Sequence, residues 1–130
     1  MSTVDLSALS MVELFQLETE SQTEILTEGL LALEQSPNAR TELESCMRAA
    51  HSLKGAARLV DLNAGVAVAH AMEDCFVAAQ EGRIILGRDE IDLLLQGVDL
   101  LIGLAKTPDL DVDGAGRKPG PEIDAFTQKL

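Results

Sequence analysis

The sequence contains no tryptophan, no tyrosine and only three phenylalanines among its 130 residues. At this length the chain can form one domain with a hydrophobic core, and 46% of its residues are hydrophobic. With so few aromatic side chains, the core has to be packed by Leu, Ile, Val, Ala and Met, which favours helices over a sandwich of strands. The composition therefore predicts a single all-α domain.

Positive charge is also scarce, because 10 Lys and Arg stand against 22 Asp and Glu and give a formal net charge of −12. Such a surface repels phosphate backbones and anionic lipid headgroups, so we expect no nucleic-acid partner and no membrane partner. The N-terminus lacks the basic, apolar and small-residue succession of a signal peptide, and no apolar run approaches the roughly 20 residues that span a bilayer. These absences predict a cytoplasmic protein.

Apolar residues recur at steps of three or four along four segments, and turn or capping signals bound each segment. The first helix is predicted to begin at residues 10–13, whose S-x-x-E pattern matches a capping box, and to end near Gln35, before a Ser-Pro-Asn turn. We expect its buried stripe to contain Leu14, Leu17, Ile25, Leu26, Leu30 and Leu33.

Three further helices are predicted over residues 39–60, over residues 64–81, and from just after Gly87 to about residue 105. Gly82 is expected to cap the third of the four helices, and acidic residues in the first turn favour the fourth. Four amphipathic helices with short connections pack most economically as an antiparallel up-down four-helix bundle. The sequence predicts this bundle over residues 1–106.

The composition changes after the predicted bundle. Residues 107–121 contain three prolines, three glycines and three aspartates, which predicts a linker. Residues 122–130 have the pattern of the start of a further helix or of an interdomain segment. We expect the sequence to continue in a longer protein.

Residues 50–59, AHSLKGAARL, place a histidine inside the second predicted helix. His51 lies about 100° round from the buried position 50, at the edge of the apolar stripe. Arg48, Lys54 and Arg58 share its face through i−3, i+3 and i+7 spacing. Gly55 inside a helix costs up to about 1 kcal/mol, and either access for a partner or close packing against another helix explains it equally well.

The third predicted helix contains His70 and, three residues later, Glu73. Because antiparallel neighbours meet near their middles, we expect His51 and Glu73 to come together. A carboxylate that accepts from the imidazole Nδ1–H leaves Nε2 with a free lone pair and stabilises positive charge on the ring. This arrangement describes a nucleophilic histidine, and Lys54 could pair with the oxygens of a phosphoryl group attached to it.

Less specific interpretations apply to several of these residues. His70 by itself favours a structural histidine, and Arg48 and Arg58 are either solvated charges or docking charges. Cys46 and Cys75 lie on or beside apolar stripes without CxxC spacing, so we expect buried, reduced thiols. A helical adaptor that carries no phosphate is the alternative function.

A metal site is a further alternative, because two histidines, a glutamate and a cysteine are available. Di-iron bundles use Glu-x-x-His on two helices together with further glutamates. Here a single His70-x-x-Glu73 runs in the reverse order. We therefore expect no metal.

The stretch HSLKG at residues 51–55, followed by AHAMED at residues 69–74, resembles the histidine phosphotransfer domain at the N-terminus of CheA-type chemotaxis kinases. The two-part resemblance spans residues 14 to 104. Its third helix is similar to that of hybrid CheA-like kinases such as those of the Wsp system.

The resemblance implies a phosphocarrier in two-component signalling. His51 would accept the γ-phosphoryl group of ATP from a CheA-type kinase domain and pass it to an aspartate of a response-regulator receiver. Glu73 would be its hydrogen-bond partner, Lys54 a phosphoryl neighbour and His70 part of the supporting network. The family's ATP-binding motifs are absent from this sequence, so ATP and Mg²⁺ would belong to the kinase domain, the bundle would hold no cofactor, and we expect it to be monomeric.

Overall fold

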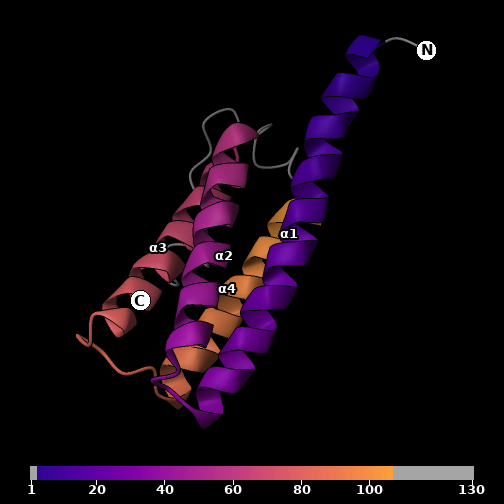
Figure 1. The fold of residues 1–130 in the computed structure, drawn as a ribbon. Helices are drawn as coiled ribbons and strands as arrows, with labels where there is room; N and C mark the ends of the chain where they lie inside the picture. The colour runs from indigo at the N-terminus through magenta and orange to yellow at the C-terminus, as the bar shows by residue number, and fades with distance from the viewer. Residues whose placement is uncertain (1–2, 107–130) are drawn as a thin grey trace.

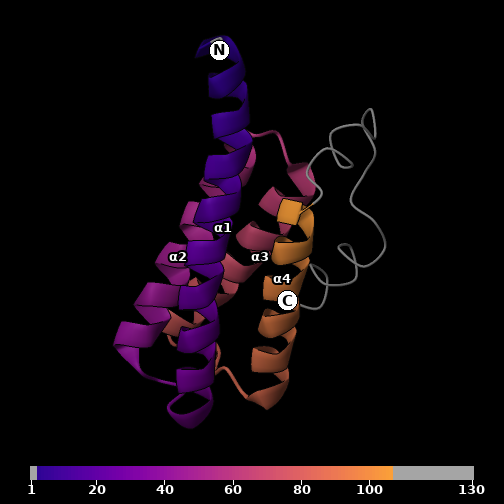
Figure 2. The ribbon, with the colours of Figure 1, turned by 90° about the vertical axis from the view of Figure 1, so that its right-hand side faces the viewer.

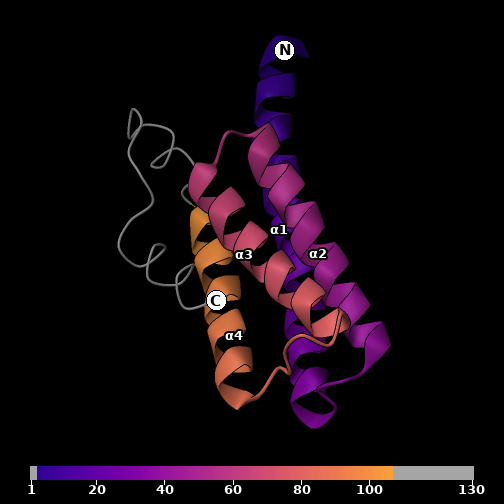
Figure 3. The same ribbon diagram turned by 90° about the vertical axis from the view of Figure 1, so that its left-hand side faces the viewer.

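The structure is a computed structural model that describes the backbone of residues 3–106 and the side chains of residues 11–106. Four helices follow one another: α1 (Thr3–Gln35), α2 (Arg40–Leu59), α3 (Asn63–Gln80) and α4 (Arg88–Lys106). Successive helices run in opposite directions, and α1 and α3 each pack against α2 and α4 (Figures 1 and 3). The described residues contain no strand, so the predicted antiparallel four-helix bundle is confirmed. The predicted linker and the segment at 122–130 lie outside the described residues.

The first helix is longer than the sequence predicted. It begins at Thr3, so residues 10–13 lie inside α1 and form no capping box at a helix start. Residues 3–9 contain neither glycine nor proline, and nothing in them stops a helix from extending toward the N-terminus. As a result α1 projects well beyond the other three helices (Figure 2).

The predicted apolar stripe of α1 is wrong at Leu14, Leu17 and Ile25. Their surfaces are 62%, 61% and 40% exposed, whereas Phe15 is buried. Leu14 and Leu17 lie about 100° and 160° from Phe15 round the helix, so they cannot share its face. The buried face of α1 includes Phe15, Thr19, Thr23, Leu26, Gly29, Leu30 and Leu33.

Helices α2 and α3 end in the same way. The residue after each helix cap has a left-handed backbone, with φ of 57° at Asp61 and 78° at Gly82. After α2 the Leu62 amide donates to the Ala57 carbonyl at 2.9 Å, and after α3 the Arg83 amide donates to the Ala78 carbonyl at 2.9 Å. These are Schellman motifs, and the predicted cap at Gly82 is confirmed.

Aliphatic side chains and two phenylalanines, Phe15 and Phe76, fill the core, as the composition predicted. Phe76 and Met72 from α3 are fully buried among leucines of the other helices. Both cysteines are free and buried, as predicted, and burial raises the pKa of Cys46 to about 12 and that of Cys75 to about 11. A Cβ at Gly29 of α1 would lie 2.5 Å from the Cys46 sulfur, so this glycine allows α1 to approach α2 closely.

Candidate functional site

His51 and Glu73 meet where α2 packs against α3. The Nδ1 atom of His51 lies 2.7 Å from the Oε2 atom of Glu73. The histidine side chain is 65% exposed, whereas that of the glutamate is only 13% exposed. The contact predicted from the positions of the two residues on neighbouring helices is therefore present, with the carboxylate inside and the ring at the surface.

Lys54 holds the other oxygen of the same carboxylate. Its Nζ atom lies 2.6 Å from Glu73 Oε1, and its side chain is 15% exposed. The spacing of three residues puts Lys54 and His51 on one face of α2, so both reach Glu73 on α3. Each carboxylate oxygen thus has one partner from α2, which fixes the orientation of the carboxylate.

The pKa of Glu73 is shifted by opposing causes. Partial burial raises it, while the hydrogen bonds and positive charges of Lys54 and His51 lower it, and the net result is a pKa below the usual 4.5. Glu73 is therefore ionised at neutral pH and acts as a hydrogen-bond acceptor. Because Glu73 can only accept, its hydrogen bond with His51 requires the ring to carry a hydrogen on Nδ1.

This tautomer determines what His51 can do chemically. With the hydrogen on Nδ1, the Nε2 atom keeps an unshared electron pair. Because Nδ1 is turned toward the carboxylate, Nε2 lies at the solvent side of an exposed ring. The arrangement suits an attack by Nε2 on an external electrophile, with Glu73 balancing the positive charge that develops on the ring.

Gly55, one turn after His51, leaves the surface beside the ring open. A Cβ at this position would meet no atom within 4 Å, so close helix packing does not explain the glycine. It lines a groove of about 690 Å³ between α1 and α2, which we name the Gly55 groove. Its lining residues are Met11, Leu14, Phe15, Glu18, Ser52, Gly55, Ala56, Leu59 and Val60.

The sequence did not point to the apolar members of this groove. Leu14 was expected to be buried, yet it is exposed, as is Leu59 at the end of α2. Leu59 follows Gly55 by four residues and lies off the buried stripe. This spacing could have predicted that Leu59 lies on the same face of the helix as His51.

His70 is placed differently from His51. Its Nε2 atom lies 3.2 Å from the Asp74 Oδ2 atom, one turn further along α3, and both side chains are largely exposed. No hydrogen bond joins it to Glu73 among the side chains of residues 11–106. Its supporting role stays a prediction.

The two arginines both lie at the surface. Arg48 pairs with Glu44 of its own helix at 3.6 Å. Arg58 is exposed near the end of α2 and forms no ion pair with residues 11–106. A docking role for either arginine stays a prediction.

The described residues contain no group of three or more His, Cys, Asp or Glu side chains arranged to hold a metal ion. Cys75, which the metal alternative would require, is packed in the core. None of the described helices is both long and apolar enough to cross a membrane.

Comparison with known sequences gives a consistent set of relatives. The sequence model of the Hpt domain family matches residues 10–103. The chain is 32% identical over 101 residues to the chemotaxis protein CheA of Borreliella burgdorferi, covering 78% of this chain and 12% of that protein. It is 32% identical over 96 residues to the sensor histidine kinase CheAY of Helicobacter pylori, covering 74% of this chain and 12% of that protein. The chain thus corresponds to a small part of each of these proteins.

Solved structures have the same fold. The CheA phosphotransferase domain from Thermotoga maritima is 26% identical, with a TM-score of 0.71 over 75% of this chain and 92% of that one. The phosphorylated P1 domain of CheA3 in complex with CheY6 from R. sphaeroides is 19% identical, with a TM-score of 0.77 over 92% of this chain and 91% of that one, and this likeness concerns the fold alone. The similarity to Wsp-type hybrid kinases stays a prediction.

Proposed function

This chain belongs to the Hpt domain family and is of the CheA type, and we propose that it carries a phosphoryl group on His51 in chemosensory two-component signalling. The observation that carries the proposal is the hydrogen bond between His51 Nδ1 and Glu73 at 2.7 Å, on an exposed ring. It leaves Nε2 as the reactive atom at the surface.

The first step is phosphorylation of His51. The Nε2 electron pair attacks the γ-phosphorus of ATP, a bond forms between nitrogen and phosphorus, and the bond from phosphorus to the bridging oxygen breaks so that ADP leaves. The ring then carries a positive charge, with its Nδ1–H still donating to Glu73. Lys54 is close enough to this carboxylate to share in balancing the charges of the phosphorylated site.

The second step passes the group on. A carboxylate oxygen of an aspartate in a response-regulator receiver attacks the phosphorus, the nitrogen–phosphorus bond breaks, and His51 returns to its neutral form. The mainly apolar Gly55 groove is lined by Ser52 and Gly55, one and four residues after His51, and would offer the receiver a surface from which its aspartate reaches Nε2. The CheA3 P1 domain, whose fold this chain shares, is in a complex with CheY6, which supports a partner of this kind.

The kinase domain is expected to be a separate unit. ATP and Mg²⁺ would be bound there, and this bundle would present only the acceptor histidine. Because the chain corresponds to 12% of the CheA of Borreliella burgdorferi, we infer that the parent protein is a protein-histidine kinase, acting in the cytoplasm.

The test is phosphorylation by a CheA-type kinase core with radiolabelled ATP. We expect an acid-labile phosphate on the wild-type chain and on His70→Gln, and none on His51→Gln. Circular dichroism of each variant verifies that the helices are intact. Equal labelling of His51→Gln and wild type would refute the assignment of His51, and no labelling of any chain by several cores would favour the phosphate-free adaptor.

A further inference from the structure

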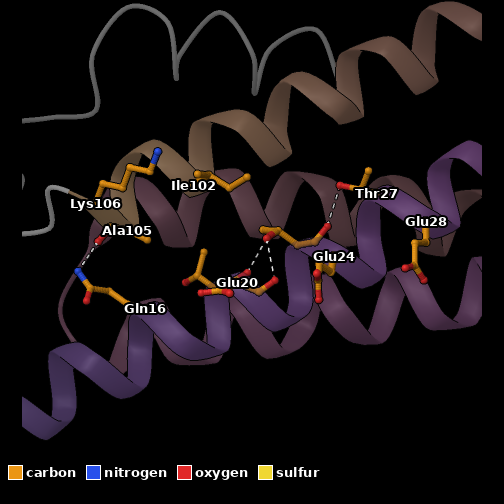
Figure 4. A pocket seen from close by; sticks show the side chains of 10 residues that line it. Gln16, Glu20, Glu24, Thr27, Glu28, Ile102, Ala105 and Lys106 are labelled. Carbon is orange, nitrogen blue, oxygen red and sulfur yellow. Dashed lines mark hydrogen bonds between the residues drawn. The ribbon is translucent and has the colours of Figure 1, made fainter.

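Charge is distributed unevenly over the helices of this acidic chain. Between residues 11 and 35, α1 contains six glutamates and neither lysine nor arginine. Figure 4 shows three of these glutamates following one another along α1: Glu20, Glu24 and Glu28. Residues 46–59 of α2, by contrast, contain three basic residues and no acidic residue. The part of α2 that contains His51 is therefore positively charged in a chain whose net charge is −12.

The three basic residues of this segment differ in their partners. Lys54 holds Glu73 at 2.6 Å, and Arg48 pairs with Glu44 at 3.6 Å. Arg58 is exposed and forms no ion pair with any described side chain. Of the three, Arg58 is therefore the cation that is available to a partner.

Arg58 lies in line with His51 along α2. The two residues are seven positions apart, so they are separated by about 10 Å along the helix axis and by only about 20° round it. Gly55 and Leu59, three residues before Arg58 and one after it, both line the Gly55 groove. Arg58 is therefore at the rim of this groove, on the face that a partner has to approach to reach His51.

The Gly55 groove has the apolar centre that is typical of a protein interface. Three of the side chains that line it are large, apolar and exposed, namely Met11, Leu14 and Leu59. A partner that covers them gains from the burial of apolar surface. A charged residue at the rim of such an interface mainly changes the rate of association and the choice of partner.

The second step of the proposed phosphocarrier function brings two anions together. The phosphoryl group on His51 is negatively charged, and the receiver attacks it with a carboxylate, so the two groups repel each other. The net charge of −12 adds to this repulsion. In the first step, by contrast, His51 reacts as a neutral ring. A cation at the rim therefore favours the receiver step over the kinase step.

We propose that Arg58 is a docking charge that pairs with a carboxylate at the edge of the receiver's interface and so selects which receivers His51 serves. This inference rests on the proposed phosphocarrier function. An ion pair at a rim raises the association rate and is screened by salt. Its effect is on the association of the two proteins and not on the cleavage of the nitrogen–phosphorus bond.

The test measures phosphoryl transfer from the prephosphorylated full chain to purified CheY-type receivers over a range of receiver concentrations. At an ionic strength of about 0.01 M, we expect Arg58→Gln to lower kcat/KM roughly two- to fivefold for the receiver that wild type serves fastest, with the rate at saturating receiver unchanged. At about 1 M salt the difference should disappear. Arg58→Lys keeps the charge and should retain the wild-type kcat/KM, whereas Arg58→Glu should lower it further.

The matched control is Arg88→Gln, which removes the same charge from an exposed residue. Arg88 is the first residue of α4 and lies at the opposite end of the bundle from the end of α2 (Figure 1). This variant should transfer like wild type. An equal loss in Arg88→Gln would assign the effect to net charge and overturn the proposal.

Three further results would also overturn the proposal. They are a wild-type kcat/KM for Arg58→Gln, a loss in Arg58→Lys as large as in Arg58→Gln, and a loss confined to phosphorylation by the kinase core. The last result would make Arg58 a contact of the kinase. If wild type is not phosphorylated on His51 at all, the phosphocarrier function itself fails, so the two failures are distinguishable.

Discussion

The bundle contains two pairs of a histidine and a carboxylate, and they are built in opposite ways. His51 and Glu73 come from different helices, and Lys54 holds the second carboxylate oxygen. His70 and Asp74 are neighbours on one helix, with 57% and 68% of their side chains exposed. The first pair is fixed by the packing of α2 on α3, whereas the second is an ordinary surface pair of the kind that contributes about 0–1 kcal/mol.

The two rings also use different nitrogens. His51 contacts its carboxylate through Nδ1, which leaves the outer nitrogen free, whereas His70 engages its carboxylate through Nε2. A carboxylate that accepts from the inner nitrogen favours the tautomer in which the outer nitrogen keeps its electron pair. This difference favours His51 over His70 as the proposed phosphoryl acceptor.

The largest expected effect is on the rate of His51 phosphorylation, when the carboxylate of each histidine pair is removed in a separate variant. A hydrogen bond to a charged group is worth about 1.5–3 kcal/mol, so Glu73→Ala should slow phosphorylation of His51 by roughly 10- to 100-fold. Asp74→Ala should stay near the wild-type rate. Single-turnover labelling with a kinase core measures both, and circular dichroism verifies that each variant is folded. Equal rates for the two variants would remove the functional distinction between the pairs.

The free energy of unfolding should depend more on the partly buried Lys54–Glu73 ion pair than on the exposed Arg48–Glu44 pair. Lys54→Met leaves Glu73 largely buried without its closest cation, so we expect the free energy of unfolding to fall by roughly 1–3 kcal/mol. The matched control is Arg48→Met. Both side chains of the Arg48–Glu44 pair are exposed, so this substitution should change the free energy of unfolding by less than about 0.5 kcal/mol. Urea unfolding measures both values, and similar losses would contradict the difference in burial.

The smallest effect concerns pH. Folding lowers the pKa of Glu73 below its ordinary value of 4.5, so the ionised carboxylate favours the folded state. This contribution is fully present above pH 4.5 and is lost as the pH falls through the lowered value. Below pH 4.5 the unfolding free energy of wild type should therefore decrease more steeply than that of Glu73→Gln. Parallel curves in urea titrations at several pH values would show that Glu73 makes no such contribution.

Much of the fold could be predicted from local signals. The Ser-Pro-Asn turn and Gly82 place the end of α1 and the end of α3 correctly, because these residues restrict or permit particular backbone angles. The start of α1 was wrong because the S-x-x-E pattern also fits the interior of a helix. The exposed Leu14 and buried Thr23 were missed because leucine is usually buried and threonine is usually exposed, and only the packing of α1 against its neighbours decides which face is covered.

The contacts of the site could be predicted only in part. The meeting of His51 and Glu73 follows from two mid-helix positions on antiparallel neighbours. The use of Lys54 as a second partner of Glu73 does not, because it depends on how closely α2 and α3 approach at that level. The contact through Nδ1 of His51 agrees with the arrangement expected for a nucleophilic histidine. The nitrogen that His70 engages could not be predicted, because it depends on side-chain geometry.

The burial of the two cysteines has a consequence for oxidative stress. Burial raises the pKa of Cys46 to about 12 and that of Cys75 to about 11, so both thiols stay protonated at neutral pH. Peroxides react with the thiolate, and both sulfurs are also shielded from solvent. The bundle should therefore keep its chemistry at His51 while surface thiols of other proteins are being oxidised.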